Sequence, residues 1–292
     1  MAELKQVGEH TYYLAGSTNI GFYLKNENEV YLIDSGNDKD AGRKIRQILD
    51  KNNWKLKAIL NTHANADHIG GNKYLQGQTK CKILVPGIDC QFTKTPILET
   101  AFLYGGFPPA DLRHKFLLAK ESDAEYLTES NLPAGIEMFS LPGHFFDMVG
   151  FKTSDDVVFL ADCLSSESTL DKYQISFIYD VEEYINTLER VKEMKAGLFI
   201  PSHAEETTDI CGLAQKNIDK VNEIAEHILS LCEEPIYFEK LLQKVFNNFG
   251  LEMNFEQYVL VGSTIRSYLA WLRNKGLLDV IFENNMLLWQ KK

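Results

Sequence analysis

Short apolar runs separated by polar segments open the chain, a pattern typical of β-strands joined by turns. The runs cover residues 12–14, 22–24 and 30–33, and the polar segment 26–29 predicts a hairpin turn between the last two. Residues 39–51 carry apolar side chains at helical spacing and lead into an apolar strand at 56–60. A strand, a helix and a strand in this order predict a βαβ unit with a right-handed crossover.

The middle of the chain, residues 86–135, lacks regular periodicity because prolines interrupt it. Residues 103–109 read Leu-Tyr-Gly-Gly-Phe-Pro-Pro and predict an exposed aromatic loop. Further along, we expect strands at 136–141, 157–161 and 197–200, with a helix at 181–195. The chain to residue 206 therefore has two β-rich halves with helices outside them, which indicates an α/β domain.

From residue 207 the periodicity becomes helical. Residues 213–232 predict a long helix that Pro235 ends, and residues 237–248 and 255–274 predict two more. Apolar runs on either side of Glu283-Asn284-Asn285 predict a hairpin with a type I′ turn. Three helices followed by a hairpin are the layout of a winged helix. We therefore expect an α/β domain at 1–206, a connecting helix at 207–234 and a small helical, winged-helix-like domain at 235–292.

Composition and charge argue against some classes of protein function. The chain has 292 residues and a net charge of −11, which argues against a protein that binds nucleic acid through bulk electrostatics. Its five cysteines lack paired spacing and indicate free thiols in a reducing compartment. The N-terminus lacks the apolar core of a signal peptide, and no apolar run is long enough to span a membrane. We therefore expect a cytoplasmic protein without a membrane partner.

Candidate metal ligands follow several of the predicted strands. His63, Asp67 and His68 come directly after the strand at 56–60. Three later strands are followed by His144, Asp162 and His203. Because strand ends meet at one edge of a sheet, we expect these side chains to converge on a cleft. Imidazole and carboxylate groups suit a divalent ion of the Zn, Fe or Mn kind. The isolated His10, His114 and His227 are interpreted as ordinary core or surface residues.

This set of residues resembles the metallo-β-lactamase superfamily, and within it the hydrolases similar to glyoxalase II. The resemblance covers roughly residues 10–205. The first motif of the family appears as Asp34-Ser35-Gly36, and the second, His-x-His-x-Asp-His, as residues 63–68. The third, fourth and fifth motifs appear as Gly143-His144, Asp162 and His203. The resemblance implies a four-layer αββα sandwich and a hydrolase that uses one or two divalent ions, with zinc the first choice and iron or manganese as alternatives.

The resemblance also implies a role for each motif residue. One metal position would use His63, Asn65 and His144, and the other would use Asp67, His68 and His203, with Asp162 bridging both. Asp34 would hold the second-motif loop by hydrogen bonds without binding metal. A bound divalent ion lowers the pKa of water from about 15.7 to about 7, and the resulting hydroxide attacks a carbonyl or phosphoryl centre. Asp67 is the candidate catalytic residue that orients the nucleophile or carries protons.

Asn65 stands where the family pattern has a histidine, and its amide oxygen is a weaker ligand than imidazole. Three interpretations follow. Asn65 ligates through oxygen and the enzyme holds an asymmetric pair of ions, tolerant of manganese or iron. Alternatively, only the metal position of Asp67, His68 and His203, with Asp162, holds an ion, and that single ion does the chemistry. In the third, catalysis has been lost and the fold serves binding.

The expected substrate is a small carbonyl compound, such as a thioester, lactone or related ester. The runner-up is a metal-dependent RNA endonuclease, because a winged helix after this domain also resembles small lactamase-like endoribonucleases. Residues 235–292 carry seven Lys or Arg and five Asp or Glu, fewer cations than DNA reading requires. A homodimer is left open. The residues suggested for a substrate lid are Tyr104, Phe107, Pro108, Tyr173, Phe177 and Tyr179. The sequence shows no cationic cluster that marks an anion pocket.

Overall fold

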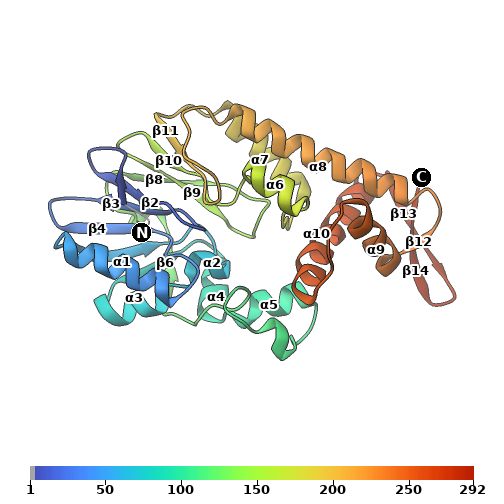
Figure 1. Cartoon of the computed structure of the whole chain (residues 1–292), viewed down its shortest axis with the longest axis horizontal. Coiled ribbons are helices and arrows are strands. Elements are labelled where there is room, and N and C mark those ends of the chain that lie inside the picture. The colour runs from blue at the N-terminus through green and yellow to red at the C-terminus, as the bar shows by residue number, and fades with distance from the viewer. Residues whose placement is uncertain (1–3) are drawn as a thin grey trace.

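The computed structural model describes residues 4–292 (Figure 1). Two β-sheets face one another with helices on both outer sides, which is the expected four-layer αββα arrangement. The first sheet has the order β1-β2-β3-β4-β5-β6-β7. Its strands are β1 (Leu4–Gln6), β2 (Thr11–Leu14), β3 (Ile20–Leu24), β4 (Glu29–Ile33), β5 (Lys55–Leu60), β6 (Lys82–Val85) and β7 (Ala124–Tyr126). The strands from β4 to β7 pair in parallel, as the predicted βαβ unit requires.

The second sheet has the order β11-β10-β9-β8. Its strands are β8 (Ile136–Ser140), β9 (Val149–Thr153), β10 (Val157–Phe159) and β11 (Leu198–Ile200). Apolar side chains of both sheets meet in the space between them, among them Ile33 and Leu60 from the first and Phe151 and Phe159 from the second. This shared layer holds the strand ends of the two sheets in a fixed relation, which positions the loops that follow them.

Helices cover the outer faces of both sheets. The helix α1 (Lys39–Lys51) begins at Asp38, whose carboxylate accepts the N–H groups of Asp40 and Ala41. Its apolar stripe, with Ile45 and Leu49, packs on the first sheet. The helices α7 (Val181–Glu193) and α8 (Cys211–Leu231) cover the second sheet. The other helices of this part are α2 (Ala66–Ile69), α3 (Asn72–Thr79), α4 (Asp89–Lys94), α5 (Ile97–Tyr104) and α6 (Glu167–Tyr173), with 3-10 turns at Ala110–Leu112 and Glu129–Asn131.

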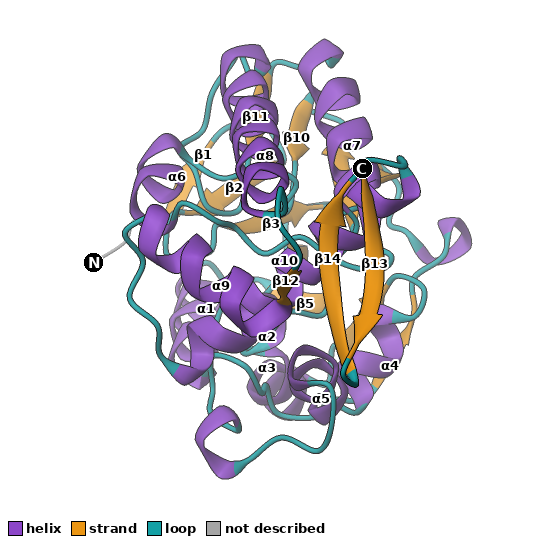
Figure 2. Ribbon diagram, turned by 90° about the vertical axis from the view of Figure 1, so that its right-hand side faces the viewer, coloured by secondary structure: helices purple, strands orange, loops and turns teal. Residues whose placement is uncertain are grey.

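The C-terminal part follows α8, which runs across the top of the molecule in Figure 1. It contains α9 (Phe238–Asn248), α10 (Phe255–Asn274) and a sheet of β12 (Ile236–Tyr237), β14 (Met286–Lys291) and β13 (Leu278–Glu283). Figure 2 shows the β13–β14 hairpin in full. Asn284 and Asn285 have φ of 49° and 61°, so the predicted Asn-rich type I′ turn is confirmed. The domain division itself stays a prediction.

One hydrophobic cluster joins the C-terminal part to the second sheet. Leu160 and Phe199 belong to it together with Leu241, Val245 and Ile265. This continuity makes the C-terminal part a packed extension of the outer helical layer. None of the helices between residues 4 and 292 is long and apolar enough to cross a bilayer.

The structure differs from the sequence prediction in the middle segment. Leu103 and Tyr104 end the helix α5 instead of lying in a loop, and Leu103 is buried against Val259 of α10. Pro108 is buried, whereas Phe107 is exposed. Leu103 packs against α10, and a loop prediction that rested on nearby prolines and glycines could not take this contact into account.

Candidate metal centre

Six of the seven predicted ligand residues converge in the structure. Their ligand atoms form two groups, each with all atoms within 4.8 Å of one another, and both groups include Asp162. One group contains Asp67, His68, Asp162 and His203; the other contains His63, His144 and Asp162. The isolated His10, His114 and His227 lie outside both groups. Asp162 is therefore the residue that the two groups share.

The ends of strands bring these groups together. His63 follows β5, and Asp67 and His68 lie on the short helix α2 that comes next. The third, fourth and fifth motifs follow β8, β10 and β11 of the other sheet. The closest pairs across this centre are His68 Nε2 with Asp162 Oδ1 at 3.1 Å, and His203 Nε2 with Asp162 Oδ2 at 3.1 Å. The site thus lies where loops from both sheets meet.

Asp34 organises the second-motif loop. It lies at the end of β4 with a φ of 62°, and its Oδ1 accepts the backbone N–H of Thr62 at 2.8 Å. Its Oδ2 accepts the Thr62 hydroxyl and His68 Nδ1–H, each at 2.8 Å. Every oxygen of Asp34 is engaged within the protein. The hydrogen-bonding role expected for Asp34 agrees with these contacts.

In four of the histidines Nδ1 is hydrogen-bonded away from the centre. His144 Nδ1 donates to the carbonyl of Phe177 at 3.0 Å, and His203 Nδ1 donates to the carbonyl of Ser17 at 2.6 Å. His68 donates to Asp34, and His63 Nδ1 lies 2.9 Å from the Thr62 hydroxyl oxygen. A carbonyl or carboxylate can only accept, so the bonds of His68, His144 and His203 place a proton on Nδ1 and direct Nε2 toward the centre, where a neutral ring offers a lone pair.

The inward-facing atoms lack partners of their own. Within residues 4–292, His63 Nε2, His68 Nε2 and Asp162 Oδ1 are buried without a hydrogen bond. His203 Nε2 lies 3.2 Å from Asp67 Oδ2, so with neutral imidazole rings acceptors would face acceptors across the centre. Such an arrangement is unfavourable unless positive charge lies between the groups. The donor set of imidazole nitrogens and carboxylate oxygens therefore fits a divalent cation.

The electrostatics of the centre agree with that conclusion. Burial lowers the pKa of His63 and of His144, which keeps both imidazoles neutral as ligands must be. At His68 and His203 burial acts the same way, but Asp162 and Asp67 outweigh it and raise the pKa of both. Protons on these two rings thus supply the positive charge that a cation would otherwise provide.

Asn65 takes part in the centre through both ends of its side chain. Its Oδ1 lies 3.1 Å from His144 Nε2, and its Nδ2 donates to Glu99 Oε1 at 2.6 Å. Glu99 comes from α5 and is buried, and burial raises the pKa of its carboxyl to about 8. Sequence reasoning missed Glu99, because a single glutamate in the proline-interrupted segment carries no motif.

A second missed residue is Asp89, at the start of α4. Its Oδ1 accepts the N–H of Ala64 and its Oδ2 accepts the N–H of Asp147, both at 2.9 Å. Asp89 is fully buried, and burial raises the pKa of its carboxyl to about 7. It therefore ties the loop of His63 to the loop of His144. No sequence signal distinguishes it from any other aspartate.

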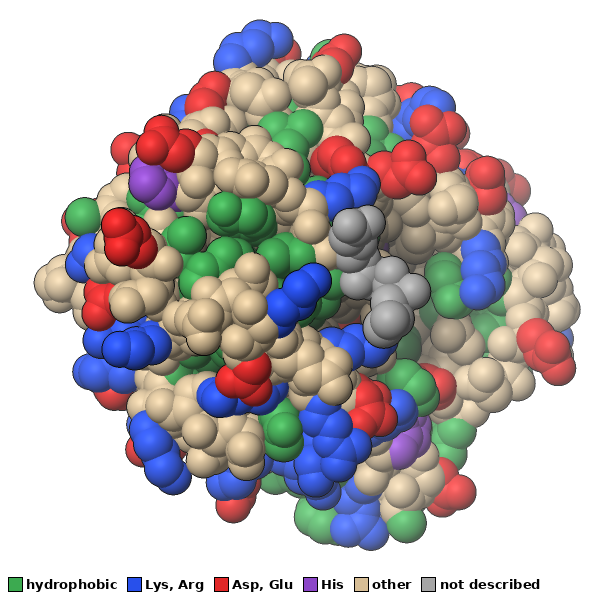
Figure 3. Space-filling model, turned by 60° about the vertical axis from the view of Figure 1, so that its left-hand side comes forward, with side chains coloured by type: hydrophobic (Ala, Val, Ile, Leu, Met, Phe, Trp, Pro, Cys, Tyr) green, Lys and Arg blue, Asp and Glu red, His purple; other side chains and the backbone are tan. Residues whose placement is uncertain are grey.

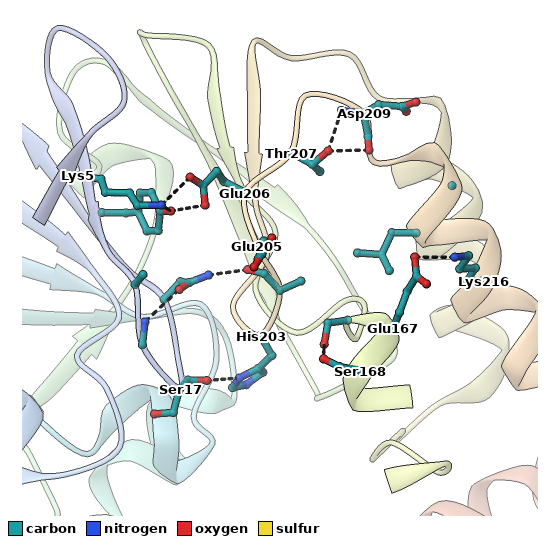
Figure 4. A pocket seen from close by; sticks show the side chains of 18 residues that line it. Lys5, Ser17, Glu167, Ser168, His203, Glu205, Glu206, Thr207, Asp209 and Lys216 are labelled. Carbon is teal, nitrogen blue, oxygen red and sulfur yellow. Dashed lines mark hydrogen bonds and ion pairs between the residues drawn. The ribbon is translucent and has the colours of Figure 1, made fainter. Parts of the chain in front are cut away.

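A hollow of about 1010 Å³ opens beside the centre and includes His203 in its wall (Figure 4). Glu206 in this wall binds Lys5, and Glu167 binds Lys216, so the charges of the hollow are largely paired. None of the six residues suggested for a lid lines it in the described structure. Phe177 and Tyr179 contact the ligand set: the carbonyl of Phe177 accepts from His144 Nδ1, and the N–H of Tyr179 lies 3.3 Å from the carbonyl of His144. The suggested lid stays a prediction.

Comparison with known proteins finds one family model. The model for the Metallo-beta-lactamase superfamily matches residues 14–203. Beta-lactamase-like protein 2 homolog of Drosophila melanogaster is 25% identical over 201 residues, which cover 68% of this chain and 62% of that protein. Probable metallo-hydrolase YybB of Bacillus subtilis is 26% identical over 214 residues, 70% of this chain and 91% of that protein. The chain thus spans less than two thirds of the Drosophila protein.

A hydroxyacylglutathione hydrolase of Nitrobacter hamburgensis is 31% identical over 123 residues, which cover 42% of this chain and 39% of that enzyme. Among solved structures, a beta-lactamase domain protein from Burkholderia ambifaria superposes with a TM-score of 0.75 at 15% identity, covering 99% of this chain and 94% of that one. A metallo-beta-lactamase family protein from Thermus thermophilus reaches 0.72 at 14% identity, covering 100% and 98%. At these identities the structures show a shared fold, which extends through the C-terminal part.

Proposed function

The chain belongs to the metallo-beta-lactamase superfamily, and we propose that it is a metal-dependent hydrolase of a small carbonyl substrate such as a thioester or lactone. One observation carries the proposal: imidazole nitrogens and carboxylate oxygens face one another in two groups that share Asp162. A structural role alone does not account for so many buried acceptor groups directed at one another, because each such contact costs free energy unless a cation or additional protons lie between the groups.

We assign two metal positions. His63, Asn65 and His144 would hold one ion, Asp67, His68 and His203 the other, and Asp162 would contact both. A bound divalent ion, for which zinc is the first choice and iron or manganese are alternatives, supplies hydroxide at neutral pH and polarises the bond that is attacked. The alternative with a single ion at Asp67, His68 and His203 keeps the same chemistry.

Asp67 is the proposed catalytic residue of the chain. Its Oδ2 accepts the hydroxyl of Thr18 at 3.2 Å and faces His203 Nε2 at the same distance. About a third of its side chain is exposed, in contrast to the buried His68. Burial acts against the charged form, yet the neighbouring His68 and His203 lower the pKa of Asp67, so its carboxylate stays ionised. The ionised carboxylate can therefore accept a hydrogen bond from a water molecule and orient it.

The hollow beside His203 is the proposed entry for the substrate. Its size suits a small molecule with a flexible tail. The partial match to relatives named hydroxyacylglutathione hydrolase supports a thioester as the substrate. The cysteines, all free thiols in the described residues, support a cytoplasmic location.

A paired assay tests the proposal. A generic thioester, a generic lactone and single-stranded RNA are incubated with the zinc-loaded chain, and His68→Ala serves as the blank. We expect thioester or lactone hydrolysis that the variant loses. Cleavage of RNA that disappears in the variant would instead identify a nuclease, and no turnover of any of them would favour a binding protein.

A further inference from the structure

We propose that Glu99 is a positioning residue that holds the Asn65 carboxamide with its oxygen toward His144, so that Asn65 serves as an oxygen ligand. This inference rests on the proposed function, because it concerns the metal position of His63, Asn65 and His144. The inference assigns Asn65 a hydrogen-bonding partner, Glu99, that the His-x-His-x-Asp-His motif of the family does not predict.

The contacts of Asn65 support a fixed orientation. An amide side chain has a donating end and an accepting end, and here the donating end reaches Glu99 Oε1 at 2.6 Å. With any carboxyl proton of Glu99 on Oε2, turning the amide over would place Asn65 Oδ1 against Glu99 Oε1, so that two acceptors would meet. Glu99 Oε1 accepts whether or not the other oxygen carries a proton, because Oε2 is the atom without a partner in the described residues.

The surroundings of Glu99 leave it no other evident role. Its side chain is 4% exposed, and it forms no ion pair with a lysine or arginine in residues 4–292. Asn65 is the one side chain in that part of the chain that hydrogen-bonds to it. Burying a carboxyl group costs free energy, and a hydrogen bond from a neutral amide offsets only part of it. The position is therefore poor for stability alone and suited to orienting Asn65.

A cobalt titration tests the proposal. Metal-free wild type, Glu99→Gln and Glu99→Met are titrated with Co²⁺, and the visible absorption of the bound ion reports each binding step. Glu99→Gln keeps an oxygen that can accept from Asn65, whereas Glu99→Met has a similar length and no such oxygen. We expect two steps in wild type and in Glu99→Gln, and a shift of the weaker step by about tenfold or more in Glu99→Met, as when a partner of a metal ligand is removed. The stronger step should not move.

Three outcomes would overturn the proposal. These are unshifted steps in a folded Glu99→Met, an equal shift in Glu99→Gln, and a single step in wild type. Thermal melting of the metal-free variants separates loss of the fold from loss of the amide orientation. If the steps stay unshifted while thioester hydrolysis persists, this inference fails and the proposed function stands. If wild type binds no Co²⁺, both fail.

A separate observation concerns a second hollow of about 670 Å³, between α1, α3 and the segment 113–120. Six cations line it: Lys39, Arg43, Lys73, Arg113, Lys115 and Lys120. We name this the basic hollow. Arg43 pairs with Asp40 and Lys115 with Asp38, and the other four have no acidic partner among the described residues. Figure 3 shows lysine and arginine side chains gathered low on the face that includes this side of the molecule.

The basic hollow concentrates positive charge on a chain whose net charge is −11. No run of the sequence marks this cluster, because its cations come from segments distant in the sequence. Asp38 and Asp40 also line the hollow, so that cations exceed carboxylates by six to two. A concave surface with such an excess of one charge sign focuses the electric field on a bound counter-ion. Tyr74, Leu118 and Ala119 add an apolar wall. We infer that the basic hollow binds a small phosphorylated molecule.

Pyrophosphate serves as the probe, titrated calorimetrically into metal-free protein so that the metal centre does not compete for it. Wild type is compared with the double variant Lys73→Glu and Lys120→Glu. The control is the double variant Lys25→Glu and Lys51→Glu, which makes the same change in net charge at two exposed positions. We expect binding that weakens at least tenfold in the first double variant and less than twofold in the control. No binding by wild type, or equal weakening in both, would overturn the inference.

Discussion

The side-chain oxygen of Asn65 lies 3.1 Å from Nε2 of His144, although 79 positions separate the two residues in the chain. His144 uses its Nδ1–H for the carbonyl of Phe177, so its neutral ring presents a lone pair to an oxygen that is itself an acceptor. With the amide in this orientation, the contact is favourable only with a cation between the two atoms. Asn65 is therefore proposed as an oxygen ligand in the place of the imidazole.

Replacing Asn65 by histidine should strengthen the metal position that it shares with His63 and His144. An imidazole there can donate one N–H to Glu99 and offer its other nitrogen to the ion, which is the usual pairing of a metal-binding histidine with a carboxylate. We expect zinc affinity at this position to rise about tenfold or more in Asn65→His, measured by competition with a chromophoric chelator. Asn65→Ala is the opposite control, and a gain in that variant would argue against ligation by residue 65.

Asp34→Ala should damage both the fold and the metal centre. The change removes acceptors for Thr62 and His68, which are buried. Leaving such donors unpaired costs about 1–3 kcal/mol each. We expect a lower midpoint of urea unfolding in the metal-free protein and a roughly 10- to 100-fold loss of zinc affinity. Normal affinity in a destabilised variant would show that Asp34 does not orient His68.

The pairing of Asp38 with Lys115 predicts a dependence of stability on pH. The hydrogen bond from Lys115 lowers the pKa of Asp38, and burial opposes it. The folded state therefore binds the Asp38 proton less readily than the unfolded state, so the stabilisation is present above the ordinary pKa of about 3.8 and is lost as pH falls through the folded value.

Asp38→Ala also removes the N-cap of α1, which contributes about 1 kcal/mol. Unfolding free energies of wild type and Asp38→Ala should differ at pH 7 and converge as the pH falls below about 4. Asp38→Asn retains the cap and should lose only the dependence on pH. A difference that is constant over the range would contradict the role of the ion pair.

The shared core predicts that the C-terminal part unfolds together with the metal-binding part. Leu242 is fully buried in the cluster that also contains Leu160 and Phe199. Leu242→Ala should cost about 2–5 kcal/mol and lower the midpoint of a single transition. Circular dichroism and the absorption of bound Co²⁺ should report the same midpoint. Two transitions, with only the first moved, would show that the parts are independent.

The sequence was sufficient for the parts of the site that depend on regular patterns. His63, His144 and Asp162 follow apolar runs, and the two packed sheets bring the ends of β5, β8 and β10 together. The turn at Asn284 and Asn285 was predictable for a similar reason, since asparagine tolerates a positive φ.

Other parts depend on contacts that no local pattern encodes. Glu99 and Asp89 act through bonds to Asn65 and Ala64, from a segment that prolines divide into short helices. The basic hollow needs Lys73 and Lys120, which only the folded chain brings together. Leu103 joins a helix because α10 covers it. Tertiary contacts determine each of these positions, and such contacts produce no periodic pattern in the sequence.

Metal per chain is the measurement that tests most directly whether these residues form a metal centre. Wild type, Asn65→His and His68→Ala are purified without chelators, supplied with zinc, dialysed and analysed for zinc and protein. We predict two ions per chain in wild type and in Asn65→His, and one or none in His68→Ala. Thioester turnover should be present in the first two proteins and lost in His68→Ala. Wild type that binds no zinc, iron or manganese under these conditions would contradict the metal centre altogether.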